Sequence, residues 1–300
     1  MTAGSIIAGG FGLARRHPGA VAVWGLVYLA ATVVAALAMR PIMATMAQMG
    51  SGDMSGPAAD AMSTAMARLI LVQMVVFGVA MVLFTAAQRA VLQPEREGFA
   101  FLRLGMDELR LFGLAVLLLI LFYIGLIIVA LVVMLLVGLI VVAAGPGAAV
   151  PLAIVAIVGV LGVVVWFQVR LSLAFPLTLM RGKIVIGEAW RTTRGHFWTL
   201  FLAFLALFLI LVVLWVAASL AASGSYFADL ASGGFTPESI QRAGERQMER
   251  QFGAITPLVV LGWALTALAG SLTIAIYGGA VATAARELTT DVDELAETFA

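Results

Sequence analysis

The chain of 300 residues contains no cysteine, one lysine and two histidines, and only 11% of its residues are charged. Without cysteine there is no disulfide scaffold, no thiolate metal site and no cysteine nucleophile. His17 and His196 are too few for a multi-ligand zinc site. Seventeen Lys and Arg against sixteen Asp and Glu leave a net charge of +1, which supplies no field for steering nucleic acid or an acidic substrate.

The short motifs that mark common catalytic and nucleotide-binding sites are also missing. The sequence contains neither a Gly-x-Ser-x-Gly nucleophile elbow nor a glycine-rich phosphate loop ending in Gly-Lys-Ser/Thr. We therefore expect a protein that is not an enzyme, with no catalytic residue, no metal site and no cofactor.

Apolar residues are abundant: 63% of the chain is hydrophobic and the mean hydropathy is +1.11. Soluble domains carry charge on about a quarter of their residues, so the composition predicts an integral membrane protein. A bilayer core about 30 Å thick needs about 20 apolar residues per helical span. Six runs qualify: Ala20 to Met39, Leu69 to Gln88, Leu111 to Ala144, Ala148 to Val169, Phe197 to Ala222, and Ile255 to Ala285. None contains Asp, Glu or Lys, which weakens the case for a proton- or cation-coupled transporter.

Glycine and proline indicate how these runs connect. Gly145-Pro146-Gly147 predicts a tight turn that makes the third and fourth spans antiparallel neighbours. The third run would be about 51 Å long as a helix, so it must tilt, kink or protrude. After the fourth run, Pro176 lacks a backbone donor and predicts a kinked extension near the membrane surface.

The basic residues are distributed unequally between the two ends of the spans. Twelve lie on one side (Arg15, Arg16, Arg89, Arg96, Arg103, Arg110, Arg170, Arg181, Lys183, Arg191, Arg194, Arg286) and five on the other (Arg40, Arg68, Arg242, Arg246, Arg250). Cytoplasmic loops are enriched in Lys and Arg, so we predict a multi-pass protein of the bacterial inner membrane with both termini cytoplasmic. A signal peptide cleaved after Ala36-Leu37-Ala38 is the alternative for the first forty residues.

A short segment ending in arginine precedes the first, third and fifth of the six apolar runs. The three copies carry Ile7, Phe11 and Arg15; Leu102, Met106 and Arg110; and Ile186, Trp190 and Arg194. Residues at i, i+4 and i+8 lie close to one helix face, so each segment predicts an interfacial amphipathic helix with a cationic rim. Such a rim makes Arg15 and Arg110 candidates for contact with lipid head groups.

The predicted fold is therefore an all-α integral membrane domain of six transmembrane helices, arranged as three pseudo-repeated hairpins. Each hairpin follows a cytoplasmic interfacial amphipathic helix. Within a single transmembrane domain, 1–300, the repeats cover about 5–92, 96–180 and 183–286, and residues 287–300 form an acidic cytoplasmic tail that is either flexible or a docking peptide. Internal symmetry also occurs in transport folds, but it does not by itself assign a function.

Small residues recur every four positions on the sixth span and predict a helix-packing ridge, either within the bundle or across a dimer. These residues are Ala267, Ser271, Ala275, Gly279 and Thr283. Other polar residues of the spans, such as Thr273 and Tyr277, are interpreted as interhelical hydrogen-bonding groups. The alternative is that they line a solute path.

Two segments on the predicted outer side are distinctive. The first holds seven methionines: Met39, Met43, Met46, Met49, Met54, Met62 and Met66. Thioethers suit Cu(I), but with no Cys or His nearby the simpler interpretation is that they fill irregular apolar contacts. The second, Thr236 to Phe252, alternates Glu with Arg and predicts a solvated helix starting near Pro237.

Residues from about Gly98 to Ile210 resemble a known family of membrane domains. The likeness rests on Arg170-Leu-Ser-Leu-Ala-Phe-Pro176, Gly187 and Ala189-Trp-Arg-Thr-Thr-Arg-Gly-His-Phe-Trp198, with a weaker match at Arg103-Leu-Gly-Met-Asp-Glu-Leu-Arg110. This pattern is similar to the membrane domain associated with glycerophosphoryl diester phosphodiesterases and to related bacterial six-helix proteins. In those diesterases a separate soluble barrel performs catalysis, so the resemblance implies no active site here. It implies a membrane module, with Arg170, Arg191 and Arg194 near phospholipid head groups.

The sequence thus favours a non-catalytic inner-membrane module that organises lipid or a protein partner. The alternative is a transporter or channel for a small solute or lipid, and phosphodiester chemistry is a more distant third. Expected partners are membrane lipids and either another membrane protein or a second copy of this chain, not nucleic acid.

Overall fold

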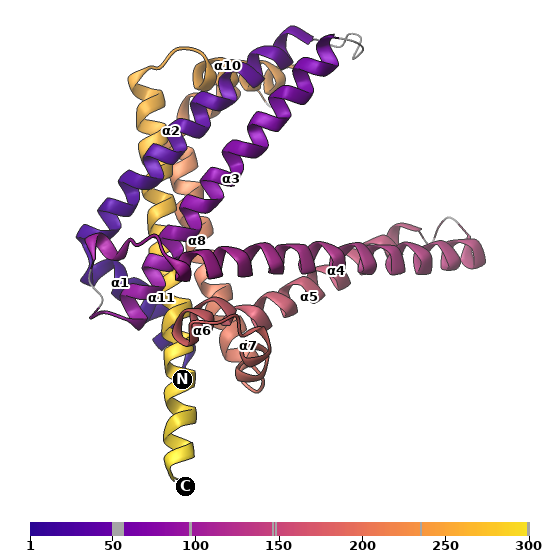
Figure 1. The fold of residues 1–300 in the computed structure, drawn as a ribbon. Coiled ribbons are helices and arrows are strands. Elements are labelled where there is room, and N and C mark those ends of the chain that lie inside the picture. Colours follow the sequence, from indigo (N-terminus) through magenta and orange to yellow (C-terminus); the bar gives the residue numbers. More distant parts are fainter. Residues whose placement is uncertain (50–56, 96–97, 146, 148, 235, 299–300) are drawn as a thin grey trace. The chain divides into compact units, whose positions relative to one another are not determined.

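The computed structural model describes the backbone of residues 1–49, 57–95, 98–145, 147, 149–234 and 236–298. The side chains of 43–49, 57–59, 144, 252 and 291–298 lie outside that description. The described residues form helices and no strand (Figure 1). In chain order the elements are α1 (Ala3–Arg16), α2 (Pro18–Met49), α3 (Pro57–Leu92), the 3-10 helix η1 (Phe99–Phe101), α4 (Met106–Ala144), α5 (Ala149–Leu171), α6 (Ala174–Arg181), α7 (Ile186–Thr192), α8 (Phe197–Ala222), α9 (Gly224–Gly233), α10 (Pro237–Phe252) and α11 (Pro257–Thr298).

Six helical segments in the described part of the chain are long and apolar enough to cross a membrane. They are Pro18–Ile42, Asp60–Leu92, Phe99–Ala143, Ala149–Arg181, Phe197–Ala222 and Pro257–Thr290. Each predicted apolar run falls almost entirely within one of them. The prediction of an all-helical protein with six candidate spans is therefore confirmed.

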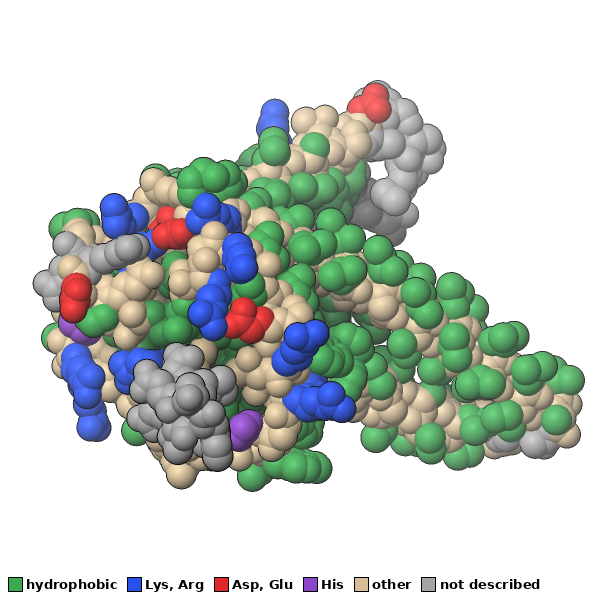
Figure 2. Space-filling model, turned by 60° about the horizontal axis from the view of Figure 1, so that its bottom comes forward, with side chains coloured by type: hydrophobic (Ala, Val, Ile, Leu, Met, Phe, Trp, Pro, Cys, Tyr) green, Lys and Arg blue, Asp and Glu red, His purple; other side chains and the backbone are tan. Residues whose placement is uncertain are grey.

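The third and fourth spans form a long hairpin. Helix α4 has 39 residues, which makes it about 58 Å long at 1.5 Å per residue. It ends at Gly145, whose φ of 86° lies in the left-handed region that favours glycine. Helix α5 then begins at Ala149 and packs along α4. Figure 2 shows hydrophobic side chains over the length of this hairpin, which fits two helices that are apolar enough to cross a membrane.

The three predicted interfacial helices differ from one another in the structure. The first and third exist as separate helices, α1 and α7. The second does not, because Met106 to Arg110 are the first residues of α4. Pro18 begins a new helix directly after His17, and Gly195, with a φ of 95°, separates α7 from α8. No comparable break follows Arg110, so the helix runs on into the span.

The predicted kink after the fourth span is a break in the helix. Helix α5 ends at Leu171 and α6 begins at Ala174, which places Pro176 in the first turn of α6. Proline is tolerated there because the first N–H groups of a helix have no intrahelical partner. The chain therefore turns at Ser172 and Leu173, just before the proline.

Contacts divide the chain into two compact units. The first unit comprises Met1–Ile6, Leu104–Phe204 and Val281–Ala300, and the second comprises Ile7–Arg103 and Leu205–Ala280. In the first unit, α6 packs against α4 and α7, and α7 packs against α5. In the second, α2 packs against α3, η1 and α10, and α9 packs against α10.

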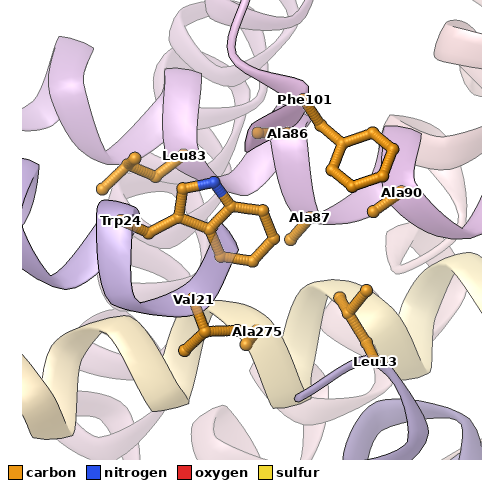
Figure 3. Close-up of a cluster of buried hydrophobic side chains, with 9 residues drawn as sticks. All are labelled: Leu13, Val21, Trp24, Leu83, Ala86, Ala87, Ala90, Phe101 and Ala275. Atoms are coloured by element: carbon orange, nitrogen blue, oxygen red, sulfur yellow. The ribbon is translucent and has the colours of Figure 1, made fainter. Parts of the chain in front are cut away.

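The core of the second unit surrounds Trp24, which has no exposed surface. Its indole lies among Leu83, Ala86 and Ala87 of α3 and Val21 of α2 (Figure 3). Its Nε1 donates a hydrogen bond of 2.9 Å to the carbonyl of Ala100. The cluster is Leu13, Val21, Trp24, Leu83, Ala86, Ala87, Ala90, Phe101 and Ala275.

Two side chains hold η1 in an uncommon backbone conformation. Ala100 and Phe101 have φ angles of 52° and 58°, in the left-handed region that non-glycine residues seldom adopt. Trp24 binds the carbonyl of Ala100, and Arg89 Nη1 donates to the carbonyl of Phe101 at 2.8 Å. Arg89 is only 2% exposed. It therefore serves the fold here, rather than extending the basic surface.

Helix α11 continues through the start of the predicted acidic tail and ends at Thr298. Ser5 Oγ donates a hydrogen bond of 2.9 Å to the carboxylate of Glu287, so α11 and the start of α1 are joined in the first unit. Residues 287–290 are thus helical, with Leu288 buried and Thr290 exposed, while the side chains of 291–300 lie outside the described residues.

Candidate functional site

Arg170, near the end of α5, lies against two tryptophan rings. Its Cζ is 5.7 Å from the centre of the Trp166 ring and 5.6 Å from that of Trp190. The two rings meet edge to face at 5.1 Å. Trp166 lies one turn earlier on the same helix, whereas Trp190 comes from α7. A cation–π contact is worth about 0.5–2 kcal/mol, so the pair of rings fixes the position of the guanidinium.

The charge of Arg170 has no counter-ion in the described part of the chain. Nε and Nη1 are covered by protein and have no hydrogen-bond partner there. Guanidinium groups recognise phosphate and carboxylate through paired N–H donors. Nη2 is the one guanidinium nitrogen not covered in this way, so Arg170, with no carboxylate partner in the described part of the chain, is suited to an external anion that approaches Nη2.

Thr193 fastens α7 to the end of α5. It is fully buried, and its Oγ1 lies 3.1 Å from the carbonyl oxygen of Arg170. The same oxygen lies 3.0 Å from the carbonyl oxygen of Ala189 and 3.2 Å from that of Trp190. One hydroxyl can thus hold the α7 segment with Trp190 beside the helix that carries Arg170.

Replacing Thr193 with valine should lower the free energy of unfolding by about 1 kcal/mol, the usual net worth of one hydrogen bond. Valine has nearly the same shape but cannot donate. Thermal unfolding in detergent measures the change, and Thr192→Val, at a half-buried neighbour, is the matched control. A loss no larger than that of the control would show that the hydroxyl does not anchor α7.

The other candidate basic residues differ in exposure and pairing. Arg110 Nη1 forms an ion pair of 3.3 Å with Asp107 and lies 3.7 Å from where a Cβ on Gly182 would stand. Arg191 and Arg194 are exposed. Arg181, on α6, pairs with Glu188 of α7 at 2.9 Å. Figure 2 shows basic side chains near the base of the apolar hairpin.

Four of the five predicted head-group arginines therefore fall in the first unit: Arg110, Arg170, Arg191 and Arg194. Arg15, exposed at the end of α1, belongs to the second unit. Sequence reasoning missed Trp166 and Thr193. The tryptophan stands four residues before Arg170, a spacing that places both on one helix face and that would have identified the pair.

The small residues of α11 lie against α1 and α2 in the second unit. Ala267, Ser271 and Ala275 are buried, and a Cβ on Gly25 of α2 would stand 3.3 Å from Ser271 Oγ. A Cβ on Gly279 would stand 3.1 Å from Cβ of Leu13 and 3.3 Å from Cα of Gly10. Thr283, also buried, belongs to the first unit. The ridge thus occupies positions of close helix approach.

Polar residues of the sixth span make hydrogen bonds within and between helices. Trp215 Nε1 of α8 donates to Thr273 Oγ1 of α11 at 3.1 Å. The hydroxyls of Thr266 and Thr273 donate to carbonyls one turn earlier in their own helix. Tyr277 stacks on Phe84 of α3 at 6.0 Å. These contacts agree with the packing interpretation of the residues.

The methionine-rich segment is only partly described. The side chains of Met43, Met46 and Met49 and the whole of Met54 lie outside the described residues. Met39 and Met62 are half-buried, and Met66 is exposed. In the described part of the chain, no three His, Asp or Glu side chains gather in a group suited to a metal ion.

The predicted solvated helix is α10, and its start matches the prediction. Thr236 caps it by accepting from the Ser239 N–H at 3.2 Å, and Pro237 is its first residue. Sequence reasoning missed its partner on α9: Asp229 pairs with Arg250 at 3.0 Å and with Arg246 at 3.6 Å. No local spacing connects α9 with α10, so only the fold reveals this pairing.

Comparisons with family models, with curated proteins and with solved structures found no match to this chain.

Proposed function

We propose that this protein is a non-catalytic module of the bacterial inner membrane that binds anionic phospholipid head groups, with both termini in the cytoplasm. The observation that carries the proposal is Arg170, held against Trp166 and Trp190 at the end of a candidate span with no counter-ion in the described part of the chain. Tryptophan and arginine at helix ends are typical of the region where head groups lie.

Neighbouring cations strengthen the proposed site. Lys183, Arg191 and Arg194 are exposed on the α6–α7–α8 segment that carries Trp190. Each basic residue near an anionic surface contributes about 1 kcal/mol of attraction. The resemblance of residues 98–210 to a membrane domain associated with diesterases supports the same role and remains a prediction.

The test is retention of phospholipid by the triple variant Arg170→Glu/Arg191→Glu/Arg194→Glu. Losing three favourable charges at about 1 kcal/mol each should weaken binding of anionic lipid about 100-fold. Native mass spectrometry of protein released from nanodiscs that contain phosphatidylglycerol measures the bound lipid. The control, Arg68→Glu/Arg242→Glu, reverses exposed charges elsewhere and should retain it.

Equal retention by the triple variant and the wild type would remove the basis of the proposal. Wild-type protein that carries no lipid but a second polypeptide would favour the organisation of a protein partner. Protein that carries neither would favour the transporter alternative, which flux into sealed vesicles then tests.

A further inference from the structure

The second unit contains a cavity of about 540 Å³ where α8 ends and α11 begins. Helix α10, Ser225 of α9 and the segment between α10 and α11 complete its lining, and Figure 1 shows α10 close to the ends of these two helices. The volume falls within the range of about 300–1,000 Å³ that is usual for ligand pockets. Neither the head-group site around Arg170 nor the packing ridge includes this cavity.

The walls of the cavity differ in chemistry. Ala222, Leu258, Val259 and Trp263 form an apolar wall that belongs to two candidate spans. A Cβ on Gly262 would stand 3.7 Å from the Cβ of Ala222, so the two helices are close together at this wall. The facing wall is α10, which lies outside the candidate spans. An occupant that satisfies both walls must have an apolar part and a polar head.

The charged side chains of α10 indicate the chemistry of that head. Arg246 and Arg250 both line the cavity and are held by one carboxylate, that of Asp229, at 3.6 Å and 3.0 Å. Two guanidinium groups that share one carboxylate retain one positive charge, and fixed guanidiniums suit phosphate. Glu249, which also lines the cavity, supplies a negative charge beside them. The polar wall thus carries both signs of charge.

We propose that this cavity binds a zwitterionic phospholipid that carries a phosphodiester and a primary ammonium. The phosphate lies at Arg246 and Arg250, the ammonium at Glu249, and the first carbons of the acyl chains along Val259 and Trp263. The rest of the chains stays in the bilayer beside α8 and α11. This site is independent of Arg170 and prefers a head group of different charge.

The experiment measures binding of dihexanoyl-phosphatidylethanolamine to the full chain in mild detergent by native mass spectrometry. The double variant Arg246→Gln/Arg250→Gln should raise the Kd at least tenfold. Its control, Arg242→Gln, changes an exposed arginine of α10 that does not line the cavity, and should leave the Kd unchanged. Val259→Trp fills the cavity from its apolar side and should also raise the Kd at least tenfold. This variant leaves the ion pairs of Asp229 with Arg246 and Arg250 in place.

Two other ligands test which parts of the lipid the cavity recognises. Glycerophosphoethanolamine, the head group alone, should bind at least tenfold more weakly than the lipid. In the variant Arg170→Glu/Arg191→Glu/Arg194→Glu, which lacks the cations of the proposed head-group site, dihexanoyl-phosphatidylglycerol should bind more weakly than the ethanolamine lipid, and adding Glu249→Gln should reduce that preference. The variant Arg170→Glu/Arg191→Glu/Arg194→Glu should bind the ethanolamine lipid as well as the wild type, whether or not the head-group proposal holds.

Unchanged affinity in Val259→Trp would overturn the cavity as the binding site. If glycerophosphoethanolamine bound as tightly as the whole lipid, the cavity would recognise the head group alone, and the proposal of an amphiphilic ligand would be overturned. Equal affinity for the two lipids in the variant Arg170→Glu/Arg191→Glu/Arg194→Glu would overturn the role of Glu249 and the preference for a zwitterion.

Discussion

Replacing Trp24 with alanine should lower the free energy of unfolding by about 3–5 kcal/mol, the range for truncating a fully buried aromatic side chain. Trp24 has no exposed surface, and its indole fills the centre of the second unit's core. Truncation leaves a cavity among the small alanines of α3, which are too short to fill it.

The substitution also removes the donor to Ala100. That carbonyl belongs to a residue in the left-handed region, where non-glycine backbone costs about 1–3 kcal/mol and persists only when its surroundings enforce it. Trp24→Phe retains most of the packing and removes the hydrogen-bond donor, so it should cost about 1–2 kcal/mol, less than Trp24→Ala. The effects of the two variants separate packing from hydrogen bonding.

Thermal unfolding in mild detergent, followed by circular dichroism, measures both variants. Trp198→Ala makes the same truncation at a side chain that is 70% exposed, and should change the unfolding free energy by less than about 0.5 kcal/mol. If Trp24→Ala were no more destabilising than Trp198→Ala, the core around Trp24 would not be what stabilises this unit.

Substituting leucine for Gly279 should cost about 1–3 kcal/mol or more, because side chains added to a closely packed contact force the helices apart. A Cβ at this position already stands 3.1 Å from Leu13 Cβ and 3.3 Å from the backbone of Gly10. The remainder of a leucine side chain has no space unless α1 moves away from α11. Small residues permit such close approaches between membrane helices.

The matched control is Gly159→Leu on α5, where no atom lies within 4 Å of an added Cβ. Helix propensity favours leucine over glycine at both positions, so only packing distinguishes them. Thermal unfolding should show a lower melting temperature for Gly279→Leu alone, and size-exclusion chromatography measures the oligomer size of both variants. Unchanged stability and an unchanged oligomer size for Gly279→Leu would contradict a packing role for the ridge.

Three arginines that look equivalent in the sequence have different environments. Arg89, Arg170 and Arg286 each stand near the end of an even-numbered span. Arg89 is buried and binds the carbonyl of Phe101, Arg170 lies against two tryptophans, and Arg286 is exposed. Pattern alone groups them as one basic surface. The two tryptophan rings beside Arg170 give that residue the features of an anion site.

The sequence by itself determined the membrane class, the six spans, the turn near Gly145 and the start of α10 at Pro237. These properties are local, because the hydropathy of about 20 residues, or the backbone preference of one glycine or proline, is sufficient to set them. The tertiary structure alone decided that Met106 opens α4 rather than a separate helix, that Trp166 and Trp190 meet at Arg170, and that Asp229 pairs with α10. The first depends on whether the chain breaks after Arg110, which no proline there marks. The other two join residues of different helices, and their distances depend on how the helices pack.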